Sequence, residues 1–289
     1  MNRRWYELKN TIRNRKGDST IVATVLLMAI TLFCMSLTLN FVQTSLARHD
    51  GENEFTLAQT FMKNIGLSVD DVAWHPGQSN TIQYSSKSAE INLRPGLIHY
   101  KIEVWRVGDH AYSPLKEFDT SVLFYDLPLT RYSLDNTYFE NILPSSMTQL
   151  VQNSTEAPIA RVFAVQRPPI VGENAYIKVG VASLLRSVQF NINANGVKTS
   201  YLKVYLANMT LGPLTTANPR YITLTGKNVD ASVYNNILHL RITISFPKSA
   251  NGYSQSFFSF PVTTQTIDFP ASGAEVELYT GNLQVGFLE

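Results

Sequence analysis

The sequence is poor in cysteine, which disulfide scaffolds and cysteine-rich zinc proteins need, and poor in charge, which disordered chains have in excess. It contains one cysteine, Cys34, so an intrachain disulfide and a cysteine-rich zinc site are both excluded. Only 16% of its 289 residues are charged and 44% are hydrophobic, which is too apolar for a disordered chain. The chain is therefore expected to fold, and its length allows one large or two ordinary domains.

Positive charge is scarce outside the first residues. Six of the 24 Lys and Arg residues lie in the first sixteen positions, beside a single acid, Glu7. Without residues 1–17 the chain has 18 basic and 21 acidic residues, a net charge of −3. The formal charge of +2 is thus a property of this basic leader, and we expect no nucleic-acid partner.

Motifs that carry a known chemistry are also missing. The chain has no GxSxG, GxxxxGK[ST], HExxH or GxGxxG motif and no EF-hand calcium loop. Its five histidines are scattered, and none has a partner at a metal-ligand spacing. We therefore predict that the protein is not an enzyme and has no cofactor and no metal site.

One long uncharged run is present near the N-terminus. No residue from Ser19 to Ala47 is charged, and the apolar block Ile21 to Val42 within it has 22 residues. As a helix this block spans about 33 Å, enough to cross a bilayer and too long for an ordinary secretory signal. Because the basic residues precede the block, the positive-inside rule places the N-terminus in the cytoplasm and the residues after Val42 outside.

A distinctive junction precedes the apolar block. Arg15-Lys16-Gly17 runs into Asp18 and a short polar step, and the aliphatic run begins at Ile21. The stretch RKGDSTIVATVLLMAIT resembles the class III signal peptides of archaeal type IV pilin-like proteins. The resemblance implies that a membrane aspartyl peptidase, the prepilin-type peptidase, cuts between Gly17 and Asp18 on the cytoplasmic side. The hydrophobic segment then stays on the mature chain.

This resemblance implies a function as well as a cleavage site. A pilin-like subunit, or a pilus-associated protein of the archaeal cell surface, uses a long helix, here 18–75, to assemble with copies of itself or with other pilin-like subunits. Its β head is then exposed outside for adhesion or interaction. The expected assembly core within the 21–42 segment comprises Ile21, Val25, Met28, Ala29 and Leu32. The alternative is a permanently anchored surface receptor, adhesin or transporter-associated module that keeps residues 1–17 as part of an uncleaved signal anchor.

Beyond the apolar block a second helical pattern follows. Six apolar residues are spaced three and four apart, which predicts a narrow helical seam. They are Phe55, Ala58, Met62, Ile65, Val69 and Val72. The seam fits the outer half of a pilin-type helix pressed on the head or on a neighbouring subunit, and equally an amphipathic helix that covers a sheet. Gly66 predicts that this helix frays toward its end, and the Trp-His-Pro-Gly sequence at 74–77 predicts where it ends.

From about Thr81 the hydrophobic period becomes two. Leu238 to Phe246 alternate apolar and polar residues, as half-buried antiparallel strands do. The other expected strands are 100–107, 175–181, 188–192, 201–207, 257–262 and 275–279. The fold class predicted is α+β, a long N-terminal hydrophobic helix followed by a mainly antiparallel, sandwich-like extracellular head. A fragment that begins near Thr81 is predicted to be soluble and β-rich.

Two β domains are a further expectation. Pro168 and Pro169 interrupt the pattern and divide a membrane-proximal β region, 80–166, from a distal one, 174–289. The nonapeptides at 135–143 and 230–238 share an Asp, a hydroxyl, an aromatic and the ending Asn-Ile-Leu, a weak internal repeat.

Two sequons offer glycosylation candidates. Asn153 and Asn208 each begin an Asn-x-Ser/Thr triplet, which is no more than chance predicts for this composition. An outside location would make both accessible.

Overall fold

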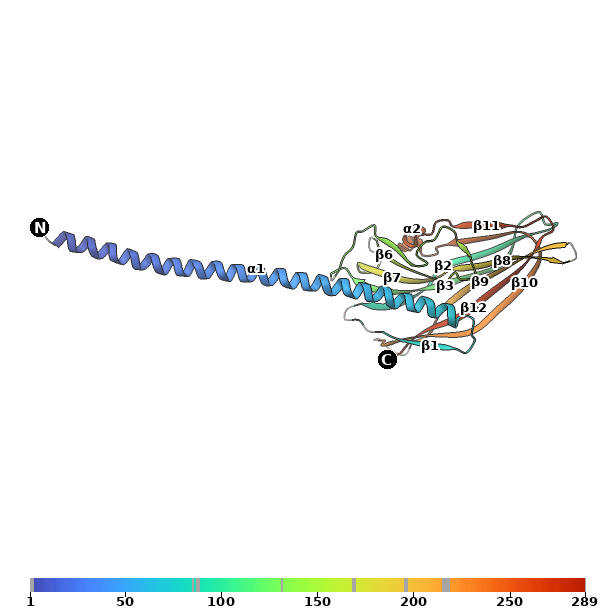
Figure 1. The fold of residues 1–289 in the computed structure, drawn as a ribbon, viewed down its shortest axis with the longest axis horizontal. Coiled ribbons are helices and arrows are strands. Elements are labelled where there is room, and N and C mark those ends of the chain that lie inside the picture. The colour runs from blue at the N-terminus through green and yellow to red at the C-terminus, as the bar shows by residue number, and fades with distance from the viewer. Residues whose placement is uncertain are drawn as a thin grey trace. The chain divides into compact units, whose positions relative to one another are not determined.

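The computed structural model describes residues 3–84, 86, 89–130, 132–167, 170–194, 197–214 and 219–288. Side chains are described from residue 21 onward, apart from 194, 197, 198 and 214. The chain divides into two compact units, Met1–Glu52 and Asn53–Glu289. The first unit is wholly helical over its described residues, and the second contains the strands (Figure 1).

Helix α1 runs from Arg3 to Val72, and short helices η1 and α2 lie late in the chain. The elements in order are α1 (Arg3–Val72), β1 (Ser79–Gln83), β2 (Glu90–Arg106), β3 (Ser113–Pro128), β4 (Phe139–Leu143), β5 (Val151–Asn153), β6 (Ala160–Gln166), β7 (Tyr176–Ser183), β8 (Leu185–Ala194), β9 (Val197–Leu214), β10 (Tyr221–Ser245), η1 (Ser249–Asn251), α2 (Gln255–Phe258), β11 (Thr264–Asp268) and β12 (Ala274–Leu288). One long apolar helix followed by a mostly β unit confirms the predicted α+β class.

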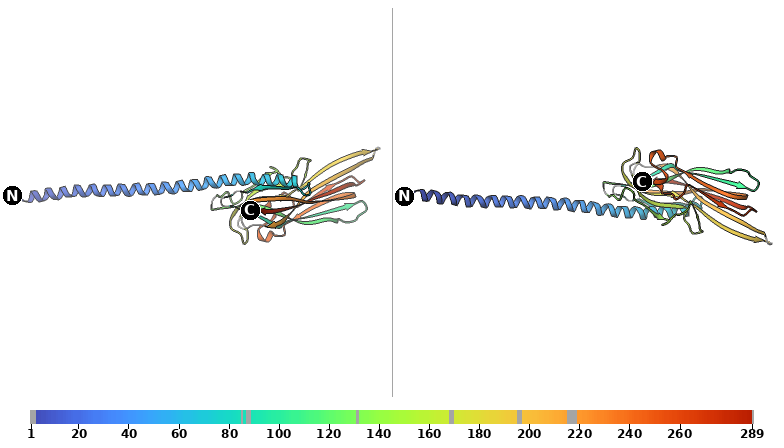
Figure 2. Two further views of the ribbon diagram at one scale, coloured as in Figure 1. Left: turned by 90° about the horizontal axis from the view of Figure 1, so that it is seen from below. Right: turned by 90° about the horizontal axis from the view of Figure 1, so that it is seen from above.

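The strands of the described chain form one hydrogen-bonded sheet of twelve. Its order is β4-β6-β7-β3-β2-β10-β12-β9-β8-β5, and β1 and β11 both pair with β10. All pairs are antiparallel except β9 with β12 and β5 with β8. Strand β12 pairs with β10 on one side and with β9 on the other, so these three strands lie side by side (Figures 1 and 2).

This topology corrects the prediction of two β domains. Strands from 80–166 and 174–289 interleave, because β7 pairs with both β3 and β6, and β2 pairs with β10. The repeated nonapeptides are not equivalent either, since one contributes the short strand β4 and the other lies within the 25-residue strand β10. Pro168 and Pro169 lie outside the described residues, and the strands that precede and follow them in the sequence, β6 and β7, are neighbours in one sheet.

Two hydrophobic cores lie on opposite faces of the sheet. The helix-side core contains the end of α1 together with residues such as Val162, Val179 and Val285. The aromatic core contains Phe124 and Phe163 with side chains from α2. Burial of apolar surface on both faces is what holds so large a sheet in one unit.

Long strands change their buried face partway along. In β12, Val276 and Leu278 belong to the aromatic core, whereas Leu283 and Val285 belong to the helix-side core. Because side chains alternate along a strand, this shift from even to odd numbers means opposite faces. Strand β12 therefore lines both cores, each with one part of its length.

The predicted seam is confirmed and covers the sheet of its own chain. All six seam residues are buried, and all belong to the helix-side core. Gly66 does not mark fraying. A Cβ at this position would lie 2.6 Å from Cγ2 of Val162, so the glycine allows α1 to approach β6 closely.

One expected strand is wrong. Residues 257–262 begin in the single turn of α2, whose N-cap Ser254 accepts a hydrogen bond from the Phe257 backbone N–H at 3.4 Å. Phe257 and Phe258 are both buried in the aromatic core. Tertiary packing of these rings overrides their strand propensity.

The end of α1 lies against two glycines of the sheet. A Cβ at Gly226 would lie 2.5 Å from the carbonyl oxygen of Val72 and 2.7 Å from that of His75, and one at Gly281 would overlap Ala73. The Gly226 backbone also exchanges hydrogen bonds with the turn after α1, accepting from Gly77 and donating to Gln78. The sheet thus accepts the helix end only where side chains are absent.

We expect Gly226→Ala to lower the free energy of unfolding by roughly 2 kcal/mol, the usual cost of overfilling a packed interior. The matched control is Gly286→Ala, since a Cβ there would meet nothing nearer than 3.9 Å. Chemical denaturation of the full chain in detergent measures both. Equal effects of the two substitutions would contradict this account of the docking.

Candidate functional site

An uncovered apolar surface dominates the first unit. Every side chain from Ile21 to Thr44 is exposed, including the large residues Phe33 and Phe41. Ile21 and Leu32 are 65% and 66% exposed. Apolar patches this large mark protein or membrane interaction sites. The chain thus carries an apolar helical segment, residues 21–44, whose side chains are all exposed.

Several polar side chains of this segment form hydrogen bonds within the helix. Thr31 donates to the carbonyl of Leu27 at 2.9 Å, and Thr38 donates to that of Cys34 at 2.8 Å. Asn40 donates its amide to the carbonyl of Ser36 at 2.9 Å. Local bonds of this kind remove the need for water, so the segment suits an apolar surrounding.

The segment has the length and composition of a membrane span. Among the described residues one helix meets these criteria; it starts at Ile21 and has a mean hydropathy of 2.4 in its most apolar window. All of the predicted assembly residues lie on it. Ile21, Val25, Met28, Ala29 and Leu32 are exposed.

The predicted processing residues lie just before this segment. Arg15, Lys16, Gly17 and Asp18 fall within the helical backbone of α1, and their side chains lie outside the described residues.

The two sequons differ in their surroundings. Asn153 ends β5 and is exposed. Asn208 lies inside β9, where its amide donates to the Asn282 side chain at 3.0 Å, and Thr210 of the same sequon donates to the carbonyl of Leu283. The structure therefore favours Asn153 as an acceptor and holds Asn208 in the sheet.

A buried ionic cluster lies in the second unit. The Lys178 ammonium is 2.9 Å from Oδ1 of Asp126 and 2.8 Å from Oε2 of Glu173. The side chains of Lys178 and Asp126 are only 4% and 2% exposed. Arg94 reaches the other oxygen of Glu173 at 3.0 Å, so two cations face two carboxylates.

The two carboxyl groups of this cluster are shifted in opposite directions. Burial raises the pKa of Asp126, against the opposing effects of Lys178 and the Asn92 amide. Burial would also raise the pKa of Glu173, but the hydrogen bond and charge of Lys178 bring it below the ordinary value. Carboxyls whose pKa values are pushed apart suit different chemical roles.

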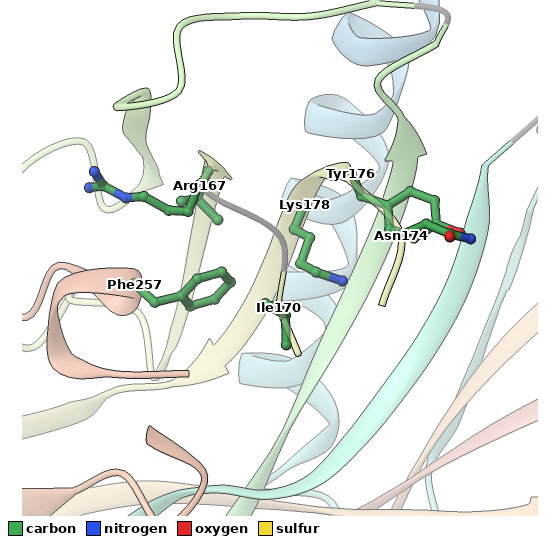
Figure 3. A pocket seen from close by; sticks show the side chains of 7 residues that line it. Arg167, Ile170, Asn174, Tyr176, Lys178 and Phe257 are labelled. Carbon is green, nitrogen blue, oxygen red and sulfur yellow. The ribbon is translucent and has the colours of Figure 1, made fainter. Parts of the chain in front are cut away.

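A small pocket opens beside Lys178. It encloses about 10 Å³, the room that one water molecule needs. Figure 3 shows Lys178 between Phe257 on one side and Tyr176 on the other. The full lining is Val165, Arg167, Ile170, Asn174, Tyr176, Lys178 and Phe257. The pocket is too small for a metabolite.

A second buried charge lies in the aromatic core. Arg161 is fully buried, and burial lowers the pKa of its guanidinium to about 10. It donates to Oδ1 of Asn141 at 2.7 and 3.0 Å, to the carbonyl of Phe258 at 2.6 Å and to that of Ser259 at 3.3 Å. Its guanidinium also lies 4.8 Å from the ring centre of Phe260. Arg161 thereby fixes the end of α2 to the sheet.

Among the described residues no group of three or more His, Cys, Asp and Glu side chains could hold a metal ion. His239 and His99 each contact a single carboxylate, that of Asp268 at 2.7 Å and that of Asp119 at 2.9 Å. Neither arrangement forms a ligand set.

Lys178, Asp126 and Arg161 were not among the residues predicted from the sequence. A signal was present, since each is a single charge inside an apolar strand pattern: YDL at Asp126, ARVF at Arg161 and IKVGV at Lys178. Charges in such runs are buried only when they are paired. Pairing across strands, however, needs the strand order.

Comparison with known proteins finds no match: no family model, no curated protein and no solved structure is similar to this chain.

Proposed function

We propose that this protein is a pilin-like subunit or pilus-associated protein of the cell surface. The helix assembles it, through the 21–42 segment, with copies of itself or with related subunits, and a sandwich-like β head faces outward. One observation carries the proposal: an exposed apolar segment, in which Thr31, Thr38 and Asn40 form hydrogen bonds within the helix, follows the Arg15-Lys16-Gly17 junction. The prepilin-type peptidase would release that segment from its basic leader.

A permanent membrane anchor is the second candidate. The same apolar length serves a bilayer as well as a filament core. In that case the leader stays, and the β unit acts as a receptor, adhesin or transporter-associated module at the outer surface. The two candidates differ in the N-terminus of the mature chain and in the fraction where the protein is found.

We expect the native protein to begin at Asp18 and to appear in filaments sheared from the cells. Ala29→Arg should remove it from the sheared fraction, because a charge in a dry helix bundle has no partner and costs several kcal/mol. Ala29→Leu adds a similar volume without charge and is the matched control. Terminal sequencing and immunoblots of sheared and membrane fractions measure these outcomes.

An intact Met1 leader and a wild-type chain confined to membranes under every growth condition would favour the permanent anchor. Loss of the protein from both fractions in Ala29→Arg would show failed insertion instead, so total cell protein is blotted alongside.

A further inference from the structure

The side chains of Lys178 and Asp126 place an amine and a carboxyl group next to each other, in the position that amide formation requires. They are directly opposite residues of the antiparallel strands β7 and β3. Their side chains meet at 2.9 Å between Nζ and Oδ1, and both are almost fully buried. Reacting groups held at about 3 Å in a fixed orientation gain a large rate advantage over groups that meet by diffusion.

We propose that Lys178 and Asp126 form an intramolecular isopeptide bond, with Glu173 carrying the proton. This inference does not depend on the proposed function, because it concerns only the second unit. The product is an amide between Nζ and Cγ that joins β7 to β3, and one water molecule is released.

The first step is a proton transfer inside the cluster. Passing a proton from the Lys178 ammonium to Asp126 turns a buried ion pair into a neutral amine and a neutral acid. Burial disfavours both charged groups. The neutral amine and acid are therefore closer in free energy to the ion pair in this site than they are in water. The raised pKa of Asp126 agrees with this direction of transfer.

The second step makes and breaks the covalent bonds. The free amine attacks Cγ of Asp126, and the C–N bond forms. Glu173 takes a proton from the nitrogen and gives it to the departing hydroxyl, so the C–O bond breaks and water leaves. Glu173 ends as a carboxylate, and nothing is oxidised or reduced.

The neighbours of the cluster fit these roles. Oε2 of Glu173 is 2.8 Å from the same Nζ, and Arg94 and the Tyr253 hydroxyl hold its other oxygen at 3.0 and 2.8 Å. The Asn92 amide donates to Oδ2 of Asp126 at 3.1 Å, where negative charge develops during the attack.

Aromatic rings and the small pocket complete the site. The Lys178 ammonium lies 5.3 Å from the ring centres of both Phe124 and Tyr176, which exclude bulk water. The adjoining pocket has room for one water molecule, the product that must leave.

Mass spectrometry of the purified full chain, with tryptic mapping, tests the bond. We expect the peptides that contain Asp126 and Lys178 to be joined, with a mass lower than their sum by that of one water, about 18 Da. Lys178→Arg keeps the positive charge but should give no joined peptide. Glu173→Gln should leave at least nine-tenths of the chains unjoined.

The matched control is Glu103→Gln, which alters another ion cluster, where Glu103 pairs with Arg241 and Lys101. It should join as the wild type does. Separate wild-type peptides, or a loss of water located at other residues, would overturn the proposal whether or not the variants fold. Full joining in Glu173→Gln would overturn the role of Glu173.

Discussion

A chain that begins at Asn53 is expected to fold as a soluble unit, whereas one that begins at Thr81 is expected to lose its native packing. Asn53 is where the second compact unit starts. The shorter chain lacks the seam of α1 and the first residues of β1. This expectation replaces the one drawn from the sequence, in which residues 81–289 were sufficient.

The size of the effect follows from the burial of the seam. Five of its side chains are large and almost fully buried, namely Phe55, Met62, Ile65, Val69 and Val72. At about 2 kcal/mol each, their removal costs on the order of 10 kcal/mol. Whole domains are stable by only about 5–15 kcal/mol. The uncovered face would also expose Val162, Val179 and their neighbours to water.

Near-ultraviolet circular dichroism, thermal unfolding and dye binding to exposed apolar surface distinguish the two fragments. The Asn53 chain should unfold cooperatively, and the Thr81 chain should bind dye without a cooperative transition. A synthetic peptide of residues 53–78 added to the Thr81 chain should restore the transition, and a peptide with Met62→Asp should not. Equal midpoints of the two fragments would refute the role given to the seam.

Local patterns in the sequence predicted helix α1 and six of the twelve strands, namely β2, β7, β8, β9, β10 and β12. The seam from Phe55 to Val72 is correct residue by residue, because a period of three and four positions is a property of the chain itself. Strand β10 contains the predicted alternation from Leu238 to Ser245. Both patterns depend only on which face of one element is buried.

The order in which the strands pair could not be predicted from the sequence. Strand β10 pairs with β1, β2, β11 and β12, and nothing in its own residues selects these partners. The prolines near Arg167 looked like a domain boundary because a break in pattern carries no information on where the next strand pairs. The Lys178 cluster was missed for the same reason, since Asp126, Lys178 and Arg94 come from three strands.

Replacing Arg161 with methionine is expected to lower the free energy of unfolding by roughly 4 kcal/mol, because the buried partners of the guanidinium lose their donor. Those partners are the side chain of Asn141 and the carbonyl groups of Phe258 and Ser259. Methionine fills most of the space of the arginine side chain. The loss in free energy of unfolding therefore comes more from the unsatisfied polar groups than from a cavity. Without its anchor α2 should also detach from the aromatic core.

Guanidinium denaturation of the full chain, with Phe and Tyr fluorescence as a second probe, measures this effect. Arg161→Lys keeps the charge but cannot reach both groups of acceptors, so it should fall between the wild type and Arg161→Met. Arg220→Met changes an exposed arginine and should alter stability by no more than about 0.5 kcal/mol. A methionine variant at least as stable as the wild type would mean that the carbonyl groups at the end of α2 find other donors, and Arg161 would then not be what holds this turn to the sheet.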